Sequence, residues 1–357
     1  MEKLSTGSNL KILVRAPNWV GDQILSYPFY CYLRELFPKA KIISVCIPSL
    51  ESIQYKNIVD EVISVPVKSS DNFIKKFSII HSLAKEVKQR GDWDIGISLP
   101  DSFSAAWFLF GSKCKLRVGY RFDGRGVLLN KALPWKSCIG VHRAQAYLNL
   151  LKPLGLSDIQ IKNFWSSALN KNFNPSKLWK ITKPLQAPEG PFWVLAPGSA
   201  AASRRWPVAY FASLAKKVVM ETGWKGVVVG GPQESSIART LCEDRLLKLE
   251  DYTNRCKISE LSEVFRCAQF NIANDSGLAH VASFCGGKVS VIVGAGDPKR
   301  TKPTGPGMVQ LNLNPVACWP CERNVCFQSG EMHNACLNGI SPDQVWNNVK
   351  TGLLGLS

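Results

Sequence analysis

Short apolar runs alternate with amphipathic stretches along most of the chain. Runs such as Lys11–Arg15, Phe192–Ala196 and Val289–Val293 are only five residues long and rich in Ile, Val and Leu, which is typical of strands buried in a parallel sheet. Each run is followed by a turn and, in most cases, by apolar residues at helical spacing, as in 24–37 and 208–221. Further strands are predicted at 42–46, 62–65, 95–99, 116–120 and 227–229, and further helices at 73–88, 142–151 and 258–268. Repeated β-α units predict an α/β fold with parallel sheets.

Five prolines interrupt the segment 152–191, where acidic residues are few. This composition is typical of a linker, and 357 residues are enough for two domains with separate cores. We therefore predict an N-terminal domain at 1–170, a linker at 171–190 and a C-terminal domain at 191–340. A last helix, 341–357, is expected to start at Ser341 and to pack near the first domain.

The segment N-D-S-G-L-A-H, residues 274–280, reads as a strand end, a tight turn and a helix start. Asp275 or Ser276 caps that helix in this interpretation, and Gly277 lets a ligand approach the main chain. Free N–H groups at a helix start attract anions, and His280 shares a helix face with Ser276. The segment predicts a phosphate-binding turn; the alternative is a capped helix with a core histidine.

Other turns rich in small residues follow strands in the second half, at 197–199, 230–231 and 294–297. None matches the dinucleotide-binding or Walker glycine patterns. Several such turns at one sheet edge still suit a nucleotide. Arg204 is placed to neutralise a pyrophosphate and Glu234 to accept hydrogen bonds from ribose hydroxyls. The alternative for Arg204 is an ordinary surface charge.

In the first half, Asp22 follows the first predicted strand, at the edge where open α/β sheets bind ligands. A carboxylate there can take a proton from a hydroxyl group, although a helix N-cap is the structural alternative. Asp92-Trp93-Asp94 has the D-x-D form of metal-dependent sugar transferases, but it stands directly before a strand, as a turn does.

The chain carries a formal charge of +17, concentrated in part between Asp101 and Gln145. That stretch has eight basic residues against two acidic ones: Lys113, Lys115, Arg117, Arg121, Arg125, Lys131, Lys136 and Arg143. Such a stretch attracts polyanions, including an anionic membrane face or a phosphorylated glycolipid, or is simply a solvated basic surface. Nucleic acid is disfavoured because no nucleic-acid-binding motif accompanies the charge. The start of the chain has no apolar export signal, which favours the cytoplasm.

Twelve cysteines are present, and the eight between Cys31 and Cys285 are expected to be reduced thiols. The other four, Cys318, Cys321, Cys326 and Cys336, fall within one short stretch that also contains His333. We favour a reduced or disulfide-pinned loop at 318–336, with a structural zinc as the alternative.

Four ordered motifs resemble the ADP-heptose:lipopolysaccharide heptosyltransferases, in particular those of the heptosyltransferase II type. They are W-V-G-D at 19–22, P-G-S with R-R-W-P, G-G-P-Q-E, and N-D-S-G-L-A-H, and the likeness runs from about Lys11 to Ile340. The resemblance implies a GT-B fold: two Rossmann-like domains facing across a cleft, the acceptor on the first and an ADP-sugar on the second. It also implies an inverting transfer that needs no metal and no cofactor.

The resemblance further implies roles for individual residues. Asp22 matches the general base, and Arg204 is taken as the second catalytic residue. The donor contacts implied are Ser199, Arg204, Glu234, Asp275, Ser276, Gly277 and His280. The family commonly has lysine where Arg204 stands and threonine where Ala273 stands, so the donor sugar itself is open.

The implied partners are ADP-heptose as donor and the lipopolysaccharide core with lipid A as acceptor. We expect a cytoplasmic protein peripheral to the anionic inner membrane, with no nucleic acid bound. The alternatives are a related transferase that uses another nucleotide-sugar, a non-catalytic GT-B protein that binds an anionic glycolipid, or a nucleotide-sugar epimerase.

Overall fold

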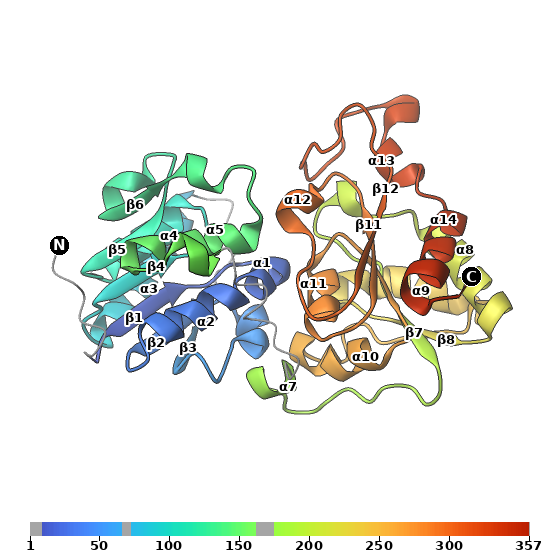
Figure 1. Ribbon diagram of the computed structural model, residues 1–357, viewed down its shortest axis with the longest axis horizontal. Coiled ribbons are helices and arrows are strands. Elements are labelled where there is room, and N and C mark those ends of the chain that lie inside the picture. The colour runs from blue at the N-terminus through green and yellow to red at the C-terminus, as the bar shows by residue number, and fades with distance from the viewer. Residues whose placement is uncertain (1–8, 66–72, 162–174, 357) are drawn as a thin grey trace. The chain divides into compact units, whose positions relative to one another are not determined.

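The structure, a computed structural model, describes residues 9–65, 73–161 and 175–356. The chain forms two compact units (Figure 1). The first holds the described residues up to 161 together with Lys177–Lys180, and the second holds 175–176 and all described residues from Ile181. Of the predicted linker 171–190, residues 171–174 lie outside the described residues. Within the first unit the N–H of Lys56 donates to the carbonyl of Leu178 at 2.8 Å.

A six-stranded parallel sheet forms the centre of the described part of the first unit. Its strands are β1 (Lys11–Arg15), β2 (Lys41–Cys46), β3 (Glu61–Ser64), β4 (Ile95–Ser98), β5 (Leu116–Arg121) and β6 (Lys131–Pro134). Their order is β3-β2-β1-β4-β5-β6, with β1 paired to both β2 and β4. This is the Rossmann order, in which the connections after β1 and β4 leave toward opposite faces. Sheets of this order bind their ligands in a crevice at the carboxyl ends of those two strands.

The described part of the second unit has the same topology in its own six-stranded parallel sheet. Its strands are β7 (Phe192–Ala196), β8 (Lys225–Val228), β9 (Leu249–Asp251), β10 (Asn271–Asn274), β11 (Val289–Val293) and β12 (Val309–Leu313). The order β12-β11-β10-β7-β8-β9 again places the first and fourth strands side by side. The predicted α/β class with parallel sheets is confirmed.

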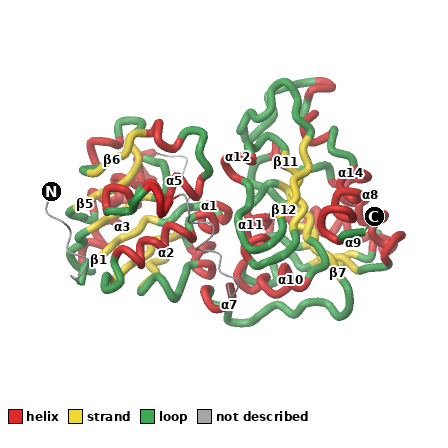
Figure 2. The backbone as a smooth tube through the Cα atoms, in the orientation of Figure 1, coloured by secondary structure: helices red, strands yellow, loops and turns green. Residues whose placement is uncertain are grey.

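Helices lie on both faces of each sheet, so that each unit has three layers with the strands in the middle (Figure 2). The helices of the first unit are α1 (Val20–Leu25), α2 (Tyr27–Leu36), α3 (Phe73–Gln89), α4 (Phe103–Gly111) and α5 (Arg143–Asn149). The short helix α7 (Pro175–Leu178) begins in the second unit and ends in the part of the chain, Lys177–Lys180, that belongs to the first. The helices of the second unit are α8 (Val208–Thr222), α9 (Ser235–Glu243), α10 (Ser262–Cys267), α11 (Gly277–Phe284), α12 (Pro298–Thr301), α13 (Ala335–Asn338) and α14 (Pro342–Asn348).

One predicted helix, 24–37, is in fact two. It breaks at Ser26, between α1 and α2. Pro28 has no backbone N–H, and in a continuous helix its ring would clash with the carbonyl of Ile24. The proline instead occupies the first turn of α2, where its missing N–H costs nothing.

The last helix, α14, is part of the second unit's core. Val345 and Trp346 are buried there, and the ring centroids of Phe270 and Trp346 lie 5.8 Å apart. α14 packs along α8. That this helix also packs near the first domain stays a prediction.

Within the described ranges, no helix is both long enough and apolar enough to cross a bilayer.

Candidate active site

The predicted general base, Asp22, lies at the switch point of the first sheet. It is the third residue of α1, directly after the loop that follows β1. Trp19 is the N-cap of this helix, so the alternative of Asp22 as a plain N-cap is wrong. A carboxylate in the first turn still gains from the positive end of the helix dipole. The Asp22 side chain keeps 28% of its surface exposed, which leaves it open to a substrate hydroxyl.

Arg143, the first residue of α5, stands between two carboxylates. Its Nε lies 3.7 Å from Oδ1 of Asp22, and its Nη1 donates to Oδ2 of Asp101 at 2.7 Å. Asp101 follows β4, the neighbour of β1, so the two acids come from the two strands that flank the crevice. Burial acts to lower the pKa of Arg143, but Tyr147, Asp22 and Asp101 raise it above the usual arginine range. One guanidinium is therefore shared by two acids.

Tyr147 completes this group from one turn further along α5. It is 3% exposed, and the Arg143 guanidinium lies over its ring at 5.9 Å. Burial, and then the charge of Asp22 together with a hydrogen bond to it, raise the pKa of Tyr147 well above the usual range. Tyr147 consequently stays a neutral phenol beside Asp22.

The second unit holds an ion pair at its own switch point. Nη1 of Arg204 lies 3.1 Å from Oδ2 of Asp275, which follows β10. Asp275 is buried, with 7% of its side chain exposed, whereas Arg204 keeps 23%. Burial raises the pKa of Asp275, and Glu322 adds to this, while Arg204 opposes it. Asp275 therefore holds Arg204 at the sheet edge and leaves part of the guanidinium exposed.

Asn274 joins the turns that carry the predicted donor contacts. Its Oδ1 accepts from the N–H of Trp206 at 3.1 Å, and its Nδ2 donates to the carbonyl of Pro197 at 2.6 Å. Nε of Arg205 donates to the carbonyl of Ser199 at 2.7 Å. Asn274 is fully buried, so these bonds are shielded from water. The turn at Pro197–Ser199 is thereby tied to the Arg204 segment.

Glu234 reaches the same turn from the end of β8. Its Oε2 accepts from the N–H of Gly231 at 2.8 Å, which closes the short turn at Pro232–Glu234. A Cβ on Gly198 would lie 2.6 Å from the Glu234 side chain. Glycine at 198 is therefore what allows the carboxylate to approach, and the predicted ribose contact lies beside the predicted phosphate turn.

The turn 274–277 leads into α11 as predicted, with Ser276 as the N-cap. Ser276 therefore caps the helix as predicted, although its side chain makes no capping hydrogen bond, and Asp275 is engaged with Arg204. The N–H groups of the first turn of a helix have no partner within the helix. His280, one turn later, is 5% exposed. Asp275 thus contacts Arg204, and Ser276, Gly277 and His280 follow it into α11 at the same sheet edge as the turn that carries Ser199.

Asp94, the second acid of the D-x-D sequence, has structural partners. It accepts from the N–H of Lys11 at 2.9 Å and from Nζ of Lys115 at 2.9 Å. Burial opposes its ionisation, but these hydrogen bonds hold the pKa of Asp94 below its usual range. The turn interpretation of this motif is supported.

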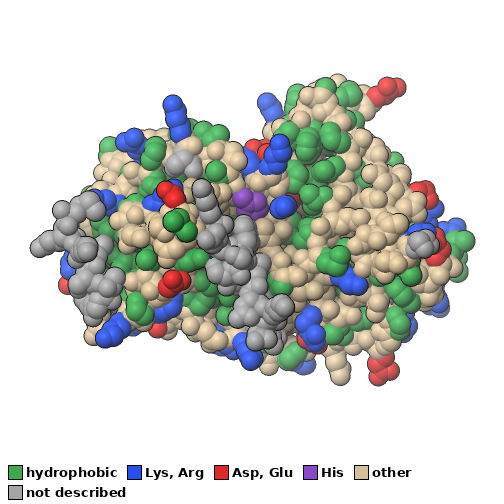
Figure 3. Space-filling view, in the orientation of Figure 1, with side chains coloured by type: hydrophobic (Ala, Val, Ile, Leu, Met, Phe, Trp, Pro, Cys, Tyr) green, Lys and Arg blue, Asp and Glu red, His purple; other side chains and the backbone are tan. Residues whose placement is uncertain are grey.

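Only some of the eight basic residues between Asp101 and Gln145 are free surface charges. Lys115 is paired with Asp94, Arg117 and Arg125 donate to backbone carbonyls, and Arg143 is shared by the two acids described above. Arg121, Lys131 and Lys136 are exposed. On the face shown in Figure 3, Lys and Arg side chains are spread over both units, with Asp and Glu among them. Three of the eight basic residues, Arg117, Arg125 and Arg143, therefore have an internal structural role, whereas Lys115 forms an exposed ion pair.

The decisive comparison is with protein families. The model of glycosyltransferase family 9 (heptosyltransferase) matches residues 80–330, which is more than two thirds of the chain. The chain belongs to this family. As a family 9 protein it is a glycosyltransferase, so the predicted resemblance and the predicted enzyme class are confirmed.

Named relatives in this family cover most of the chain. The lipooligosaccharide heptosyltransferase 2 of Haemophilus ducreyi is 24% identical over 94% of this chain and 97% of that protein. The lipopolysaccharide heptosyltransferase 2 of Salmonella typhimurium is 26% identical over 82% of this chain and 85% of that protein.

Solved structures show the same fold. The ADP-heptose lps heptosyltransferase II of E. coli superimposes with a TM-score of 0.70 at 21% identity, covering 97% of this chain and 99% of that one. A family 9 glycosyltransferase of Veillonella parvula gives a TM-score of 0.74 at 22% identity, covering 98% of each chain. The predicted GT-B fold class is confirmed. The cleft between the domains and the roles of individual residues remain predictions.

Sequence reasoning missed Asp101, Arg143 and Tyr147 as neighbours of Asp22. Asp101 lies just beyond a predicted strand and Arg143 at the start of a predicted helix, so a systematic search of strand ends and helix starts would have found both. Gly296 was also missed: a Cβ there would lie 2.1 Å from Oδ2 of Asp275. Its turn, 294–297, had been noted only for its small residues.

Proposed function

We propose that this family 9 protein transfers heptose from ADP-heptose to the inner core of lipopolysaccharide, with inversion and without a catalytic metal. The observation that carries the proposal is the pair of switch-point sites. One presents a part-exposed carboxylate, Asp22, and the other a part-exposed cation, Arg204, beside a helix N-terminus. The names of the relatives, heptosyltransferases of lipopolysaccharide or lipooligosaccharide, support the substrate class.

In the proposed reaction, Asp22 accepts the proton of an acceptor hydroxyl group as its oxygen attacks the anomeric carbon of heptose. The new C–O bond forms on the face opposite the departing diphosphate, so the configuration inverts. The bond to the diphosphate breaks, and ADP leaves with the electron pair. The charge that builds up on the leaving oxygen is stabilised by Arg204, His280 and the first N–H groups of α11.

The geometry of the second unit supports the other donor contacts that we propose. Ser199 lies in the turn that Asn274 ties to the Arg204 segment, and it is our proposed phosphate contact. Glu234 packs against the same turn and is our proposed nucleoside contact. Asp275 orients Arg204 rather than contacting the acceptor.

We further propose that the protein works at the cytoplasmic side of the inner membrane as a peripheral protein. Exposed Arg121, Lys131 and Lys136 suit an anionic lipid surface or the phosphates of lipid A. Phe122 and Ile139 are 50% and 61% exposed, which adds apolar side chains to this part of the surface. Binding to vesicles with and without anionic lipid measures the association, and equal binding to neutral vesicles contradicts the charge argument.

The test is a transfer assay with ADP-heptose and a purified core acceptor. A mass shift of the acceptor by one heptose is expected, together with release of ADP and an inverted anomeric signal by NMR. Asp22→Ala is expected to bind ADP with the affinity of the wild type but to produce no ADP from ADP-heptose. A brief incubation with a chelator of Mg²⁺ and Mn²⁺ is expected to leave the rate unchanged. Equal product from Asp22→Ala overturns the role of Asp22, and no product with any acceptor overturns the function.

A second candidate is transfer of another sugar from its nucleotide. Arg204 favours it, because arginine presents a planar fork where a lysine presents a point charge. Competition between ADP-heptose and other nucleotide-sugars in the same assay distinguishes the two. Conversion of the nucleotide-sugar without acceptor indicates an epimerase, and donor or glycolipid binding without turnover indicates a binding protein.

A further inference from the structure

The segment between β12 and α13, residues 314–334, has little regular secondary structure. Its regular structure is a single 3₁₀ turn at Gly330–Met332. Val325 and Phe327, two of its apolar side chains, are 66% and 52% exposed. A connection of this length without helices or strands is uncommon in a compact domain and normally needs a function or a cross-link. Burial of apolar surface is a poor explanation for its shape.

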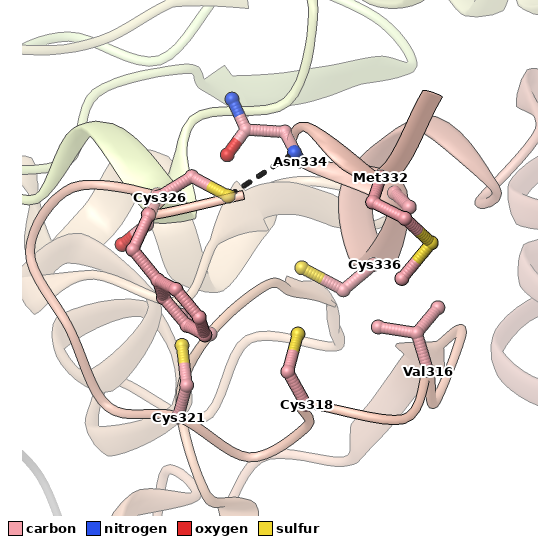
Figure 4. A pocket seen from close by; sticks show the side chains of 11 residues that line it. Val316, Cys318, Cys321, Cys326, Met332, Asn334 and Cys336 are labelled. Carbon is pink, nitrogen blue, oxygen red and sulfur yellow. Dashed lines mark hydrogen bonds between the residues drawn. The ribbon is translucent and has the colours of Figure 1, made fainter. Parts of the chain in front are cut away.

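Four cysteine side chains gather on one small cavity in this segment. Cys318, Cys321, Cys326 and Cys336 all line it, together with Ser203 and Ala295 from the sheet edge. In Figure 4 the sulfurs of Cys318, Cys321 and Cys336 point toward a common space, and the sulfur of Cys326 lies across it. All four are half-buried free thiols. Four thiols around one space suit a single ligand better than two separate disulfides.

A backbone contact reaches one of the four sulfurs. The N–H of Asn334 donates to Sγ of Cys326 at 3.3 Å. Such a donor suits a thiolate ligand, because hydrogen bonds to a charged acceptor are stronger than those to a neutral one.

We propose that Cys318, Cys321, Cys326 and Cys336 bind one thiophilic divalent cation, with zinc as the reference ion. Four thiolates are a closed, structural ligand set, and binding releases the four thiol protons. Among the described residues no group of three or more Cys, His, Asp or Glu already stands as a metal-binding set. The thiols must therefore turn inward to reach the Zn–S distance of about 2.3 Å. The site is structural and separate from the proposed chemistry.

His333 is not one of the ligands in this proposal. It is absent from the residues that line the cavity. Its Nδ1 lies 3.0 Å from the carbonyl of Gln328, and its Nε2 lies 3.2 Å from Nδ2 of Asn334. Replacing His333 therefore provides a matched control next to the site.

The cysteine segment also contacts the turns that carry the donor site. The N–H of Ser203 donates to the carbonyl of Asn324 at 3.1 Å, and the N–H of Glu322 donates to the carbonyl of Ala295 at 2.8 Å. Nε1 of Trp319 donates to the carbonyl of Gly294 at 2.9 Å. Ser203 directly precedes Arg204, and Ala295 precedes Gly296. A bound cation thus braces the backbone on both sides of the Arg204–Asp275 pair.

The first experiment measures metal in tag-free protein purified under reducing conditions. About one equivalent of zinc or iron per chain is expected, as is the charge-transfer absorption of Co²⁺-thiolate when protein stripped of metal is titrated with Co²⁺. Each of Cys318→Ser, Cys321→Ser, Cys326→Ser and Cys336→Ser is expected to lose the metal. His333→Gln, and Cys267→Ser at an exposed cysteine elsewhere in the unit, are expected to keep it.

Three outcomes overturn the proposal: reduced protein that takes up no Co²⁺, two disulfides with no metal, or metal retained by all four serine variants. The Co²⁺ titration uses wild-type protein, so a serine variant that fails to fold does not remove the test.

The second experiment measures ADP binding before and after a mercurial reagent releases the ion from wild-type protein. A loss of affinity on the order of tenfold, reversed by thiol and Zn²⁺, is expected if the ion braces the donor site. Unchanged ADP affinity overturns the proposed effect of the ion on the donor site but not the metal site itself. Neither readout requires transfer, so a failure of the proposed sugar chemistry is seen separately.

Discussion

The two switch-point sites occupy the same place in two copies of one topology, yet they treat their carboxylates differently. Asp22 is 28% exposed and shares Arg143 with a second acid, whereas Asp275 is 7% exposed and has the cation Arg204 beside it. Burial raises the pKa of Asp275, and Arg204 only partly opposes it. Topology therefore sets where a side chain is presented, and local burial decides what it can do.

The comparison assigns a division of roles. A carboxylate that must exchange a proton has to be accessible, with its charge only partly neutralised. A carboxylate that orients a cation can be buried, provided that the cation stays nearby.

Removing the accessible acid has the largest expected effect. Asp22→Asn keeps the shape of the side chain but cannot accept a proton, so turnover is expected to fall by about 10²–10⁴. The affinity for ADP, measured by calorimetry, should not change. The control is Asp101→Asn, which removes the other acid on Arg143 and should cost much less. Equal losses in the two variants would show that the Asp22 carboxylate has no special role.

Removing the cation of the other site comes next. Arg204→Ala is expected to lower kcat by about 10²–10³, because the departing diphosphate loses a charged partner. Arg204→Lys restores the charge but not the fork and should recover part of the rate. Lys216→Ala, which removes an exposed cation on α8 of the same unit, is the control. An unchanged kcat for Arg204→Ala, with only KM altered, would reduce Arg204 to a binding residue.

A third test disturbs the buried acid without removing it. In Gly296→Ala the new Cβ would lie 2.1 Å from Oδ2 of Asp275, which forces the ion pair apart. Overpacking of this kind costs about 1–3 kcal/mol, and we expect ADP affinity to fall by about tenfold. Gly231→Ala is the matched control, since its Cβ would meet nothing closer than 3.5 Å. Similar losses in both variants would contradict the argument.

The smallest effect is a pH dependence of stability. Because the pKa of Asp275 is raised in the folded state, its charged form is unfavourable there, and its contribution to stability falls as the pH rises through the window above the usual value of 3.8. Asp275→Asn removes this dependence. The free energy of unfolding of the variant relative to wild type should therefore rise as the pH rises through that window and stay constant above it. Urea unfolding at several pH values measures it, and a difference that is constant with pH argues against a raised pKa.

The sequence predicted the central strands well because they are continuous apolar runs. Phe192–Ala196 and Val289–Val293 were located to the residue. The edge strands β6, β9 and β12 were missed. They are short or partly exposed, and β6 ends in a proline, so their pairing partner rather than their own pattern makes them strands.

The sequence predicted those site residues that lie near the ends of predicted strands. Asp22, Arg204 and Asp275 each follow or adjoin a predicted strand, and the structure places the last two 3.1 Å apart. The contact of Arg143 with Asp22 and Asp101 joins residues up to 121 positions apart in the sequence. This contact forms because β4 lies beside β1 in the sheet, and the sequence pattern does not give the order of strands within a sheet. The helix break at Ser26, by contrast, is indicated by Pro28 in the sequence itself.

The position of Trp346 in the core has a consequence for how the protein is made. A nascent chain can complete the described part of the first unit once Lys180 has left the ribosome, but the second unit lacks part of its interior until α14 follows more than 160 residues later. Until then, the part of α8 that α14 covers stays open, although α9 already packs on α8, and this open part is the expected chaperone-binding region during synthesis.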